Sequence, residues 1–314
     1  MRVLHITNNF PTKKFPIFGV FVKEQIASLT RKGISNEVLF INGREKGKLE
    51  YIKSIFFIRR KLRKKNFDVI HCHHALSAIC LILTGMAKKN KVVVSFQNDP
   101  EYELGKRLYN YIKRKTSAQI FKNNSLLIND DKSFYLPNGV DLNFFKLIDK
   151  NEARGKLDLK KEKTYILFVS SNFIRPQKRY DRFQKVLQLL KTNYGHDNLE
   201  ELKLINIERA KIPLYFNAVD LHLLTSDFEG SPNSVKECLT CNTSVVSTNV
   251  GNVKDLLKDV NGSFVSEKNN PEELAFLVDK SLKWKGEKKS REKIIQKKLD
   301  INSVAEKLIN IYRT

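Results

Sequence analysis

The sequence predicts an α/β protein with two doubly wound domains, each built on a parallel sheet. Short apolar runs that are typical of buried parallel strands alternate along the chain with longer stretches of helical period. The chain has 314 residues, whereas a single hydrophobic core stops growing at roughly 250 to 300 residues. The alternation also begins anew after a charged stretch at 150–163. These three observations favour two domains of the same class.

The first half is expected to form a parallel sheet with helices on both faces. Helical stretches at 20–32 and 75–88, the second unusually apolar, separate the predicted strands. Those strands are 2–7, 36–41, 68–71, 91–96 and 125–128. A doubly wound sheet of this kind binds ligands beyond the carboxyl ends of its strands.

The second half repeats the pattern after 150–163, which we interpret as a linker. Its first strand is expected at 164–170. At the end of the chain, 301–313 has apolar residues at helical spacing. The expected boundaries are 1–149 for the first domain, 150–298 for the second and 299–314 for a terminal helix.

The composition predicts a globular protein without disulfides or membrane-spanning helices. With 41% hydrophobic and 10% aromatic residues, the chain can bury two cores. No apolar run approaches the roughly 18 residues that a membrane span requires, and residues 1–7 are typical of a strand rather than a signal peptide. Four cysteines, at 72, 80, 238 and 241, are too irregularly spaced for a disulfide framework. We therefore expect an intracellular protein with reduced thiols.

The formal charge of +23 is concentrated in two clusters, at 44–65 and 283–298. Within the first cluster, 51–65 has apolar residues at helical spacing among basic ones. The apolar residues are Ile52, Ile55, Phe56 and Leu62. A basic amphipathic helix suits an anionic membrane surface, but an ordinary solvated helix explains the pattern equally well. Nucleic acid is a weaker candidate partner, because no recognition motif accompanies the charge.

Two carboxylates separated by seven residues, Glu229 and Glu237, stand around a predicted helix start. In the segment Ser-Asp-Phe-Glu-Gly-Ser-Pro-Asn-Ser-Val-Lys-Glu-Cys-Leu, Ser231 is expected to cap a helix whose first residue is Pro232. The unpaired amides of that helix end favour an anion such as a diphosphate. Glu237 is expected to lie off the apolar stripe and to face a cleft. An ordinary amphipathic helix with solvated glutamates is the alternative, and spacing alone does not separate the two.

The flanking stretches, 212–226 and 244–253, are predicted to place a helix and two buried strands around this segment. Together they resemble the C-terminal, donor-binding half of retaining GT-B glycosyltransferases of family 4. The motif Glu-Gly-Ser-Pro-Asn-Ser-Val-Lys-Glu is similar to that of the branch of the family that builds bacterial cell-surface polysaccharides. The sequence Pro-Asn-Gly-Val-Asp at 137–141 also resembles the family.

The resemblance implies the GT-B fold, in which two Rossmann-like domains face a central cleft and the terminal helix packs back on the first domain. It implies a retaining transfer from a nucleotide-sugar, with a UDP-sugar as the favoured donor, to a lipid-linked or growing polysaccharide acceptor. The place of action would be the cytoplasm, peripherally at the inner face of the bacterial cell membrane. No cofactor, metal or nucleic acid is expected, because lysine, arginine and a helix end would stabilise the leaving diphosphate.

The roles of the family's residues transfer to particular positions of this chain. Glu237 would accept hydrogen bonds from the ribose hydroxyls, and Glu229 would contact the donor sugar near the reacting carbon. Lys178 matches the lysine that neutralises the donor diphosphate. The backbone segment that would hold sugar or phosphate consists of Gly230, Ser231, Pro232 and Asn233.

Three further assignments come from the resemblance. The family's arginine usually follows the strand directly, where this chain has Ser171-Asn172, so Arg175 or Arg179 is expected to replace it. His73, at the end of a predicted strand, matches the histidine that the family delivers to the sugar. Gly19 matches the loop glycine that touches donor phosphate and acceptor.

Two other kinds of protein stay open, in part because 191–212 is shorter than in relatives. One is a non-catalytic, polybasic membrane- or nucleic-acid-binding protein on a degenerate GT-B scaffold. The other is a sugar-nucleotide epimerase of the same fold. A metal site in the run His-Cys-His-His at 71–74 is not expected, since alternate side chains of a strand point to opposite faces.

Overall fold

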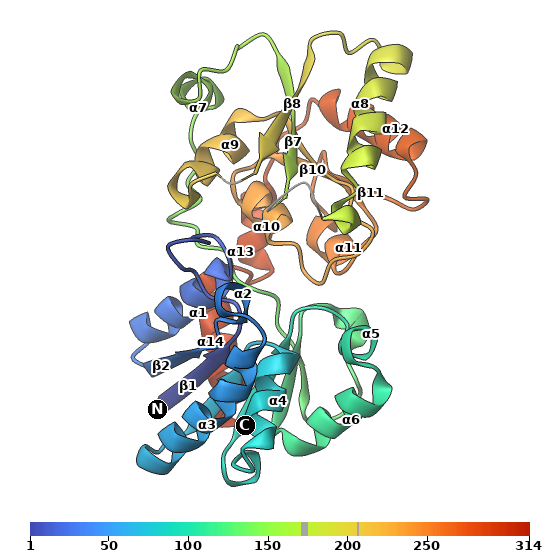
Figure 1. The fold of residues 1–314 in the computed structure, drawn as a ribbon. Coiled ribbons are helices and arrows are strands. Elements are labelled where there is room, and N and C mark those ends of the chain that lie inside the picture. Colours follow the sequence, from blue (N-terminus) through green and yellow to red (C-terminus); the bar gives the residue numbers. More distant parts are fainter. Residues whose placement is uncertain (171–174, 206) are drawn as a thin grey trace. The chain divides into compact units, whose positions relative to one another are not determined.

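The computed structural model describes residues 1–170, 175–205 and 207–314. It divides into two compact units (Figure 1): unit 1 is Met1–Gly139 with Ile301–Thr314, and unit 2 is Val140–Asp300. Residues 140–149, expected in the first domain, therefore belong to the second. The reason is burial, because Phe145 lies in the core of unit 2.

Unit 1, all of whose residues are described, contains a six-stranded parallel sheet in the order β2-β1-β3-β4-β5-β6. Its strands are β1 (Arg2–Thr7), β2 (Ser35–Phe40), β3 (Val69–Cys72), β4 (Val92–Phe96), β5 (Ala118–Phe121) and β6 (Ser133–Tyr135). The chain moves outward from β1 to β2 and then returns to the other side of β1. The topological switch point, where open α/β sheets bind ligands, therefore lies between the carboxyl ends of β1 and β3.

Helices cover both faces of this sheet. They are α1 (Val20–Arg31), α2 (Gly43–Lys46), α3 (Leu49–Lys64), α4 (Ala75–Leu83), α5 (Pro100–Leu104), α6 (Lys106–Lys115) and α14 (Ile301–Arg313), with 3-10 turns η1 (Ala87–Lys89) and η2 (Asn124–Leu126). On one face, α1 and α14 pack side by side (Figure 1), and Leu29 and Leu308 share a core with Val3 of β1. On the other face, α3, α4 and α6 contribute Ile58, Leu81 and other side chains to a second core.

One predicted strand of this unit, at 125–128, is wrong. β5 lies earlier in the chain, and all of its residues are buried. The expected segment instead overlaps η2, where the side-chain oxygen of Asn123 accepts a hydrogen bond from the amide of Ser125 (3.1 Å). Asparagine favours such a turn because its short side chain competes for nearby backbone amides. The remaining predicted strands of unit 1 agree with the structure to within one residue.

The described residues of unit 2 form a five-stranded parallel sheet in the order β11-β10-β9-β7-β8. The strands are β7 (Thr164–Val169), β8 (Leu199–Leu204), β9 (Leu221–Leu224), β10 (Ser244–Thr248) and β11 (Phe264–Ser266). The helices are α7 (Lys150–Lys156), α8 (Tyr180–Tyr194), α9 (Ile212–Ala218), α10 (Asn233–Thr240), α11 (Val253–Leu257), α12 (Pro271–Leu282) and α13 (Ser290–Gln296), with 3-10 turns η3 (Pro176–Lys178) and η4 (Arg209–Lys211). Phe183 of α8 and Leu274 of α12 pack on one face of the sheet, and Phe216 of α9 on the other. The switch point of this sheet lies between β7 and β9.

The linker predicted at 150–163 is wrong, because its first half is a helix tied to unit 2. The buried side chain of Arg154 in α7 donates to Asp220 Oδ2 (2.7 Å) and to the carbonyl oxygen of Ala218 (2.9 Å). Lys150 pairs with the same aspartate (2.6 Å). Two of the charged residues that suggest a linker, Lys150 and Arg154, are thus partners of one structural carboxylate.

Candidate functional site

An ion pair between Lys178 and Glu229 lies where the segments after β7 and β9 meet, at the switch point of unit 2. Lys178 Nζ is 2.6 Å from Glu229 Oε1, and the two side chains are only 13% and 18% exposed. The hydroxyl of Ser226 donates to the same carboxylate oxygen (2.7 Å). Thr225, at the end of β9, donates to the carbonyl oxygen of Lys178 (2.9 Å), which fastens the two segments together. The structure thus brings together two residues that the sequence predicted for one site.

A second ion pair joins Glu237 of α10 to Arg209 of η4. Arg209 Nη1 donates to Glu237 Oε1 at 2.8 Å, and both side chains are half-buried. The Arg209 guanidinium lies 5.2 Å and 5.0 Å from the ring centroids of Phe144 and Phe145, within cation–π range. Sequence reasoning missed Arg209, because no periodic pattern distinguishes one arginine among 57 basic residues.

Helix α10 begins at Asn233, so the predicted helix cap is wrong. Pro232, expected as the first helical residue, occupies the N-cap position, and no side chain caps the helix. Ser231 lies one residue before the N-cap, and its hydroxyl accepts a hydrogen bond from Nζ of the fully buried Lys236 (2.9 Å). The first amides of α10 thus have no side-chain cap, and such amides attract anions.

Gly251, in the turn after β10, lies against the loop that carries Glu229. Its φ of +54° is in the left-handed region, and a Cβ atom there would be 2.3 Å from the carbonyl oxygen of Gly230 and 2.6 Å from that of Glu229. The amide of Asn252 also donates to the carbonyl oxygen of Gly230 (3.1 Å). Only glycine permits this approach, and β10 thereby helps to set the position of Glu229.

The two candidate arginines of the η3 segment differ in their partners. Arg179 pairs with Asp181 (2.7 Å) and Asp227 (3.2 Å), which raises the pKa of its guanidinium. Arg175 is exposed, and its Nε and Nη2 lie 2.9 Å and 2.7 Å from the side-chain amide oxygen of Gln177. Ser171-Asn172, where the family's arginine usually stands, lies outside the described residues.

In unit 1, Gly19 precedes α1 and holds the loop after β1 in place. Its φ is +70°, and a Cβ atom there would lie 2.3 Å from the carbonyl carbon of Asn9 and 2.6 Å from the amide nitrogen of Phe10. The side-chain amide of Asn9 donates to Nε2 of His74 (2.7 Å). The loop after β1 therefore packs against the segment that follows β3.

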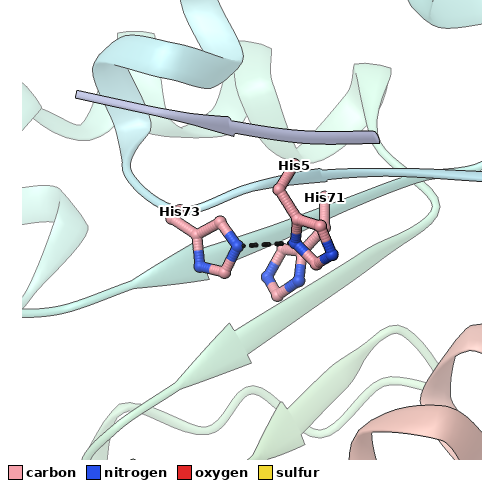
Figure 2. A group of neighbouring side chains, drawn as sticks. All are labelled: His5, His71 and His73. Atoms are coloured by element: carbon pink, nitrogen blue, oxygen red, sulfur yellow. Dashed lines mark hydrogen bonds between the residues drawn. The ribbon is translucent and has the colours of Figure 1, made fainter. Parts of the chain in front are cut away.

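Three buried histidines meet at the switch point of unit 1 (Figure 2). His5 Nδ1 of β1 is 2.9 Å from Nε2 of His73, which directly follows β3. His71 of β3 stacks on His73 with 4.0 Å between ring centroids, and its nitrogens lie 2.6 Å from Tyr312 Oη and 2.8 Å from Ser95 Oγ. Strand alternation places His71 and His73 on one face. The convergence with His5 was not predicted.

The ring nitrogens of these histidines lie within 4.8 Å of one another, close enough for a metal ion, and two of them are also within hydrogen-bond distance. With zinc–nitrogen bonds of about 2.0 Å, two ligands of one tetrahedral ion lie about 3.3 Å apart. The nitrogens of His5 and His73 are closer, at 2.9 Å. Both nitrogens of His71 already have other partners.

Burial determines the charge of this cluster. It lowers the pKa of His5 to about 4, and it lowers the pKa values of His71 and His73 well below their ordinary range, so the rings are neutral at pH 7. Burial also lowers the pKa of Lys122, which follows β5 directly and donates to the carbonyl oxygen of Leu136 (2.9 Å), to about 7. Sequence reasoning missed Lys122, since the strand that ends before it was not predicted.

The comparisons with known proteins agree with this architecture. Similar solved structures include sucrose-phosphate synthase from Thermosynechococcus elongatus (12% identity, TM-score 0.76, covering 100% of this chain and 98% of that chain) and a glycosyltransferase from Rickettsia africae (18%, 0.74, 99% and 97%). Another is HepE from Anabaena in complex with UDP (14%, 0.70, 99% and 99%). The chain has the GT-B fold. No curated protein matches it.

Within this GT-B chain, residues 204–299 match the family model of the glycosyl transferases group 1. The matched segment lies in unit 2 and contains Arg209, Glu229 and Glu237. It supports glycosyl transfer as the activity of the chain. Lys178 lies before this segment, and His73 and Gly19 belong to unit 1.

Proposed function

We propose that this GT-B chain is a retaining glycosyltransferase that takes a sugar from a nucleotide-sugar, with a UDP-sugar as donor. The observation that carries the proposal is the pairing of both carboxylates with cations, Lys178–Glu229 and Arg209–Glu237, around the uncapped start of α10. A diphosphate offers charge to such cations, and ribose and sugar offer hydroxyls to such carboxylates. Anabaena HepE has been solved with UDP and with UDP-glucose, which supports the choice of donor.

The proposed chemistry is electrostatic. Lys178 and Arg175 neutralise the diphosphate, and the backbone of Gly230, Ser231, Pro232 and Asn233 holds phosphate or sugar. Glu237 accepts hydrogen bonds from the ribose hydroxyls, and Glu229 contacts the donor sugar. As the bond between the anomeric carbon and the phosphate oxygen breaks, negative charge grows on the diphosphate, where the cations and the α10 amides stabilise it. The acceptor attacks the same face of the sugar, and no metal ion is needed.

Unit 1 contributes two residues to the proposal. His73 forms a hydrogen bond to a sugar hydroxyl at the carboxyl end of β3. Gly19 has no side chain, so Asn9 of the loop after β1 can pack closely against it. In the proposal, this loop contacts phosphate and acceptor.

The proposed acceptor is lipid-linked or a growing polysaccharide, at the inner face of the cell membrane. The support is an exposed apolar row on α3, which lies among basic residues. The row consists of Leu49, Ile52, Phe56 and Phe57, each more than half exposed. Apolar side chains flanked by lysine and arginine suit the surface of an anionic bilayer.

This row differs from the predicted stripe, which is wrong. Leu62 is buried, and Ile55 packs against the core of unit 1, whereas Ile52 and Phe56 face outward. Helix α3 thus has one apolar face for the core and a second one that is exposed. Among the described residues, no helix combines the length and apolarity needed to cross a membrane.

The test is a product analysis by mass spectrometry with a panel of UDP-, GDP- and ADP-sugars and lipid or oligosaccharide acceptors. We expect transfer of the sugar with its anomeric configuration retained, and loss of transfer in Lys178→Ala. Conversion of the donor without an acceptor would identify an epimerase instead. If no nucleoside diphosphate shifts the melting temperature and no product forms, the chain is a non-catalytic membrane- or nucleic-acid-binding protein.

A further inference from the structure

The tautomer of His73 follows from the hydrogen bonds around it, beginning at Asn36 of β2. The side-chain nitrogen of Asn36 donates to Thr30 Oγ1 (3.0 Å) and to the carbonyl oxygen of Ile34 (3.0 Å). A carbonyl oxygen only accepts, so these contacts fix the orientation of the amide. The side-chain oxygen of Asn36 therefore faces Nε2 of His5, at 2.9 Å.

His5 must then carry its proton on Nε2. The oxygen of Asn36 can only accept, so the His5 nitrogen that faces it donates. Because burial lowers the pKa of His5 to about 4, the ring is neutral near pH 7 and has a single N–H. Nδ1 of His5 is consequently a lone-pair acceptor.

His73 must in turn donate from Nε2, which lies 2.9 Å from that acceptor (Figure 2). Burial, and then the neighbouring His71, hold the pKa of His73 well below its ordinary range, so this ring is also neutral. Its other nitrogen, Nδ1, is left as an acceptor. Within the described residues, the hydrogen bond that His73 forms through its ring is the one from Nε2 to His5.

We propose that Asn36 and His5 are positioning residues that fix His73 as a hydrogen-bond acceptor, and that Nδ1 of His73 receives the O–H of a sugar hydroxyl. This proposal rests on the proposed glycosyl transfer. The hydrogen bonds from Asn36 through His5 to His73 form a relay. It runs from the edge strand β2 through β1 to the end of β3, so it ends at the switch point of the sheet. It explains why two neighbouring strands carry polar side chains into an otherwise apolar interior.

The first test needs no activity. In protein labelled with ¹⁵N-histidine, long-range ¹⁵N–¹H spectra at pH 7 should show His73 protonated at Nε2 and unprotonated at Nδ1. The His73→Asn variant assigns the signals. A proton on Nδ1 of His73, or one equivalent of zinc that co-purifies with the wild type and is lost in His73→Asn, would overturn the proposal, whereas glycosyl transfer could still stand.

The second test compares two replacements of His5. Glutamine offers an amide oxygen to His73 Nε2, whereas leucine offers no acceptor. We expect His5→Leu to lower kcat/KM about tenfold, which corresponds to about 1.4 kcal/mol, and to abolish the single Nε2–H tautomer of His73. His5→Gln should stay within about twofold of the wild type and keep that tautomer.

The matched control is Ser95→Ala, which removes a buried hydrogen bond to His71 in the same cluster but leaves the relay intact. It should preserve the tautomer of His73, with kcat/KM within about twofold of the wild type. Equal losses in His5→Leu, His5→Gln and Ser95→Ala, with the His73 spectrum unchanged in all three, would show that His5 only fills space.

Discussion

The substitution Gly251→Ala should disable the site without touching a charged residue. An added Cβ atom would lie 2.3 Å from the carbonyl oxygen of Gly230, whereas ordinary contacts begin near 3.4 Å. The loop that carries Glu229 must therefore retreat by about 1 Å, and a misplacement of about this size costs roughly 100-fold in rate. Left-handed backbone at a non-glycine residue costs a further 1–2 kcal/mol or so of folding stability.

Gly195→Ala is the matched control in the same unit. Gly195 has a φ of +72°, but nothing lies within 4 Å of its missing Cβ atom. Both variants should therefore lose stability in thermal unfolding, while only Gly251→Ala should lose turnover in a donor-saturated assay, by about 100-fold. A Gly251→Ala enzyme with the kcat of the wild type would refute the argument that β10 sets the position of Glu229.

Three other predictions concern the donor site and the surface of α3. Lys178→Ala should lower turnover severely while EDTA leaves the wild type active, since the cation at the diphosphate belongs to the protein; activity lost to EDTA and restored by magnesium or manganese would contradict this. Glu237→Ala should weaken binding of a nucleoside diphosphate by about 1.5–3 kcal/mol in calorimetry, whereas Glu229→Ala should mainly lower kcat; an unchanged Kd in Glu237→Ala would exclude its contact with ribose. Replacing six basic residues with glutamine should weaken the free energy of binding to anionic vesicles by about 1 kcal/mol per residue and leave nucleotide binding intact. Rising salt should also release the protein from these vesicles. The six are Arg59, Arg60, Lys61, Arg63, Lys64 and Lys65. Equal binding of variant and wild type to anionic and neutral vesicles would identify an ordinary solvated helix.

The parts of the fold that could be predicted are those with a strong local pattern. Buried parallel strands are runs of apolar residues, so β1 and β7 were predicted to within a residue at each end. The apolar stripe of α10 is likewise buried, at Val235, Cys238 and Leu239. Lys178 and Glu229, which the family resemblance assigns to one site, form an ion pair.

The parts that could not be predicted depend on partners far apart in the sequence. His5 meets His73 across 68 residues, and Arg209 meets Glu237 across 28. Periodicity describes the face on which a side chain lies, but it carries no information about which charge or ring lies opposite. The predicted cap at Ser231 failed for a local reason, because the helix begins at Asn233 and Pro232 occupies the N-cap position.

If the proposed donor binds at the two ion pairs of unit 2, these pairs also affect which anions bind there. Lys178 and Arg209 each face a carboxylate, at 2.6 Å and 2.8 Å, so these four groups carry no net charge although the whole chain carries +23. A ligand that brings only negative charge, such as inorganic phosphate, must draw Lys178 away and leave Glu229 half-buried without its cation, which is costly. The proposed nucleotide-sugar supplies a new partner to each residue of the pair. Its phosphate replaces the carboxylate as the partner of Lys178, and a sugar hydroxyl replaces the ammonium as the partner of Glu229. Binding of the proposed donor is then an exchange of partners that free phosphate does not offer.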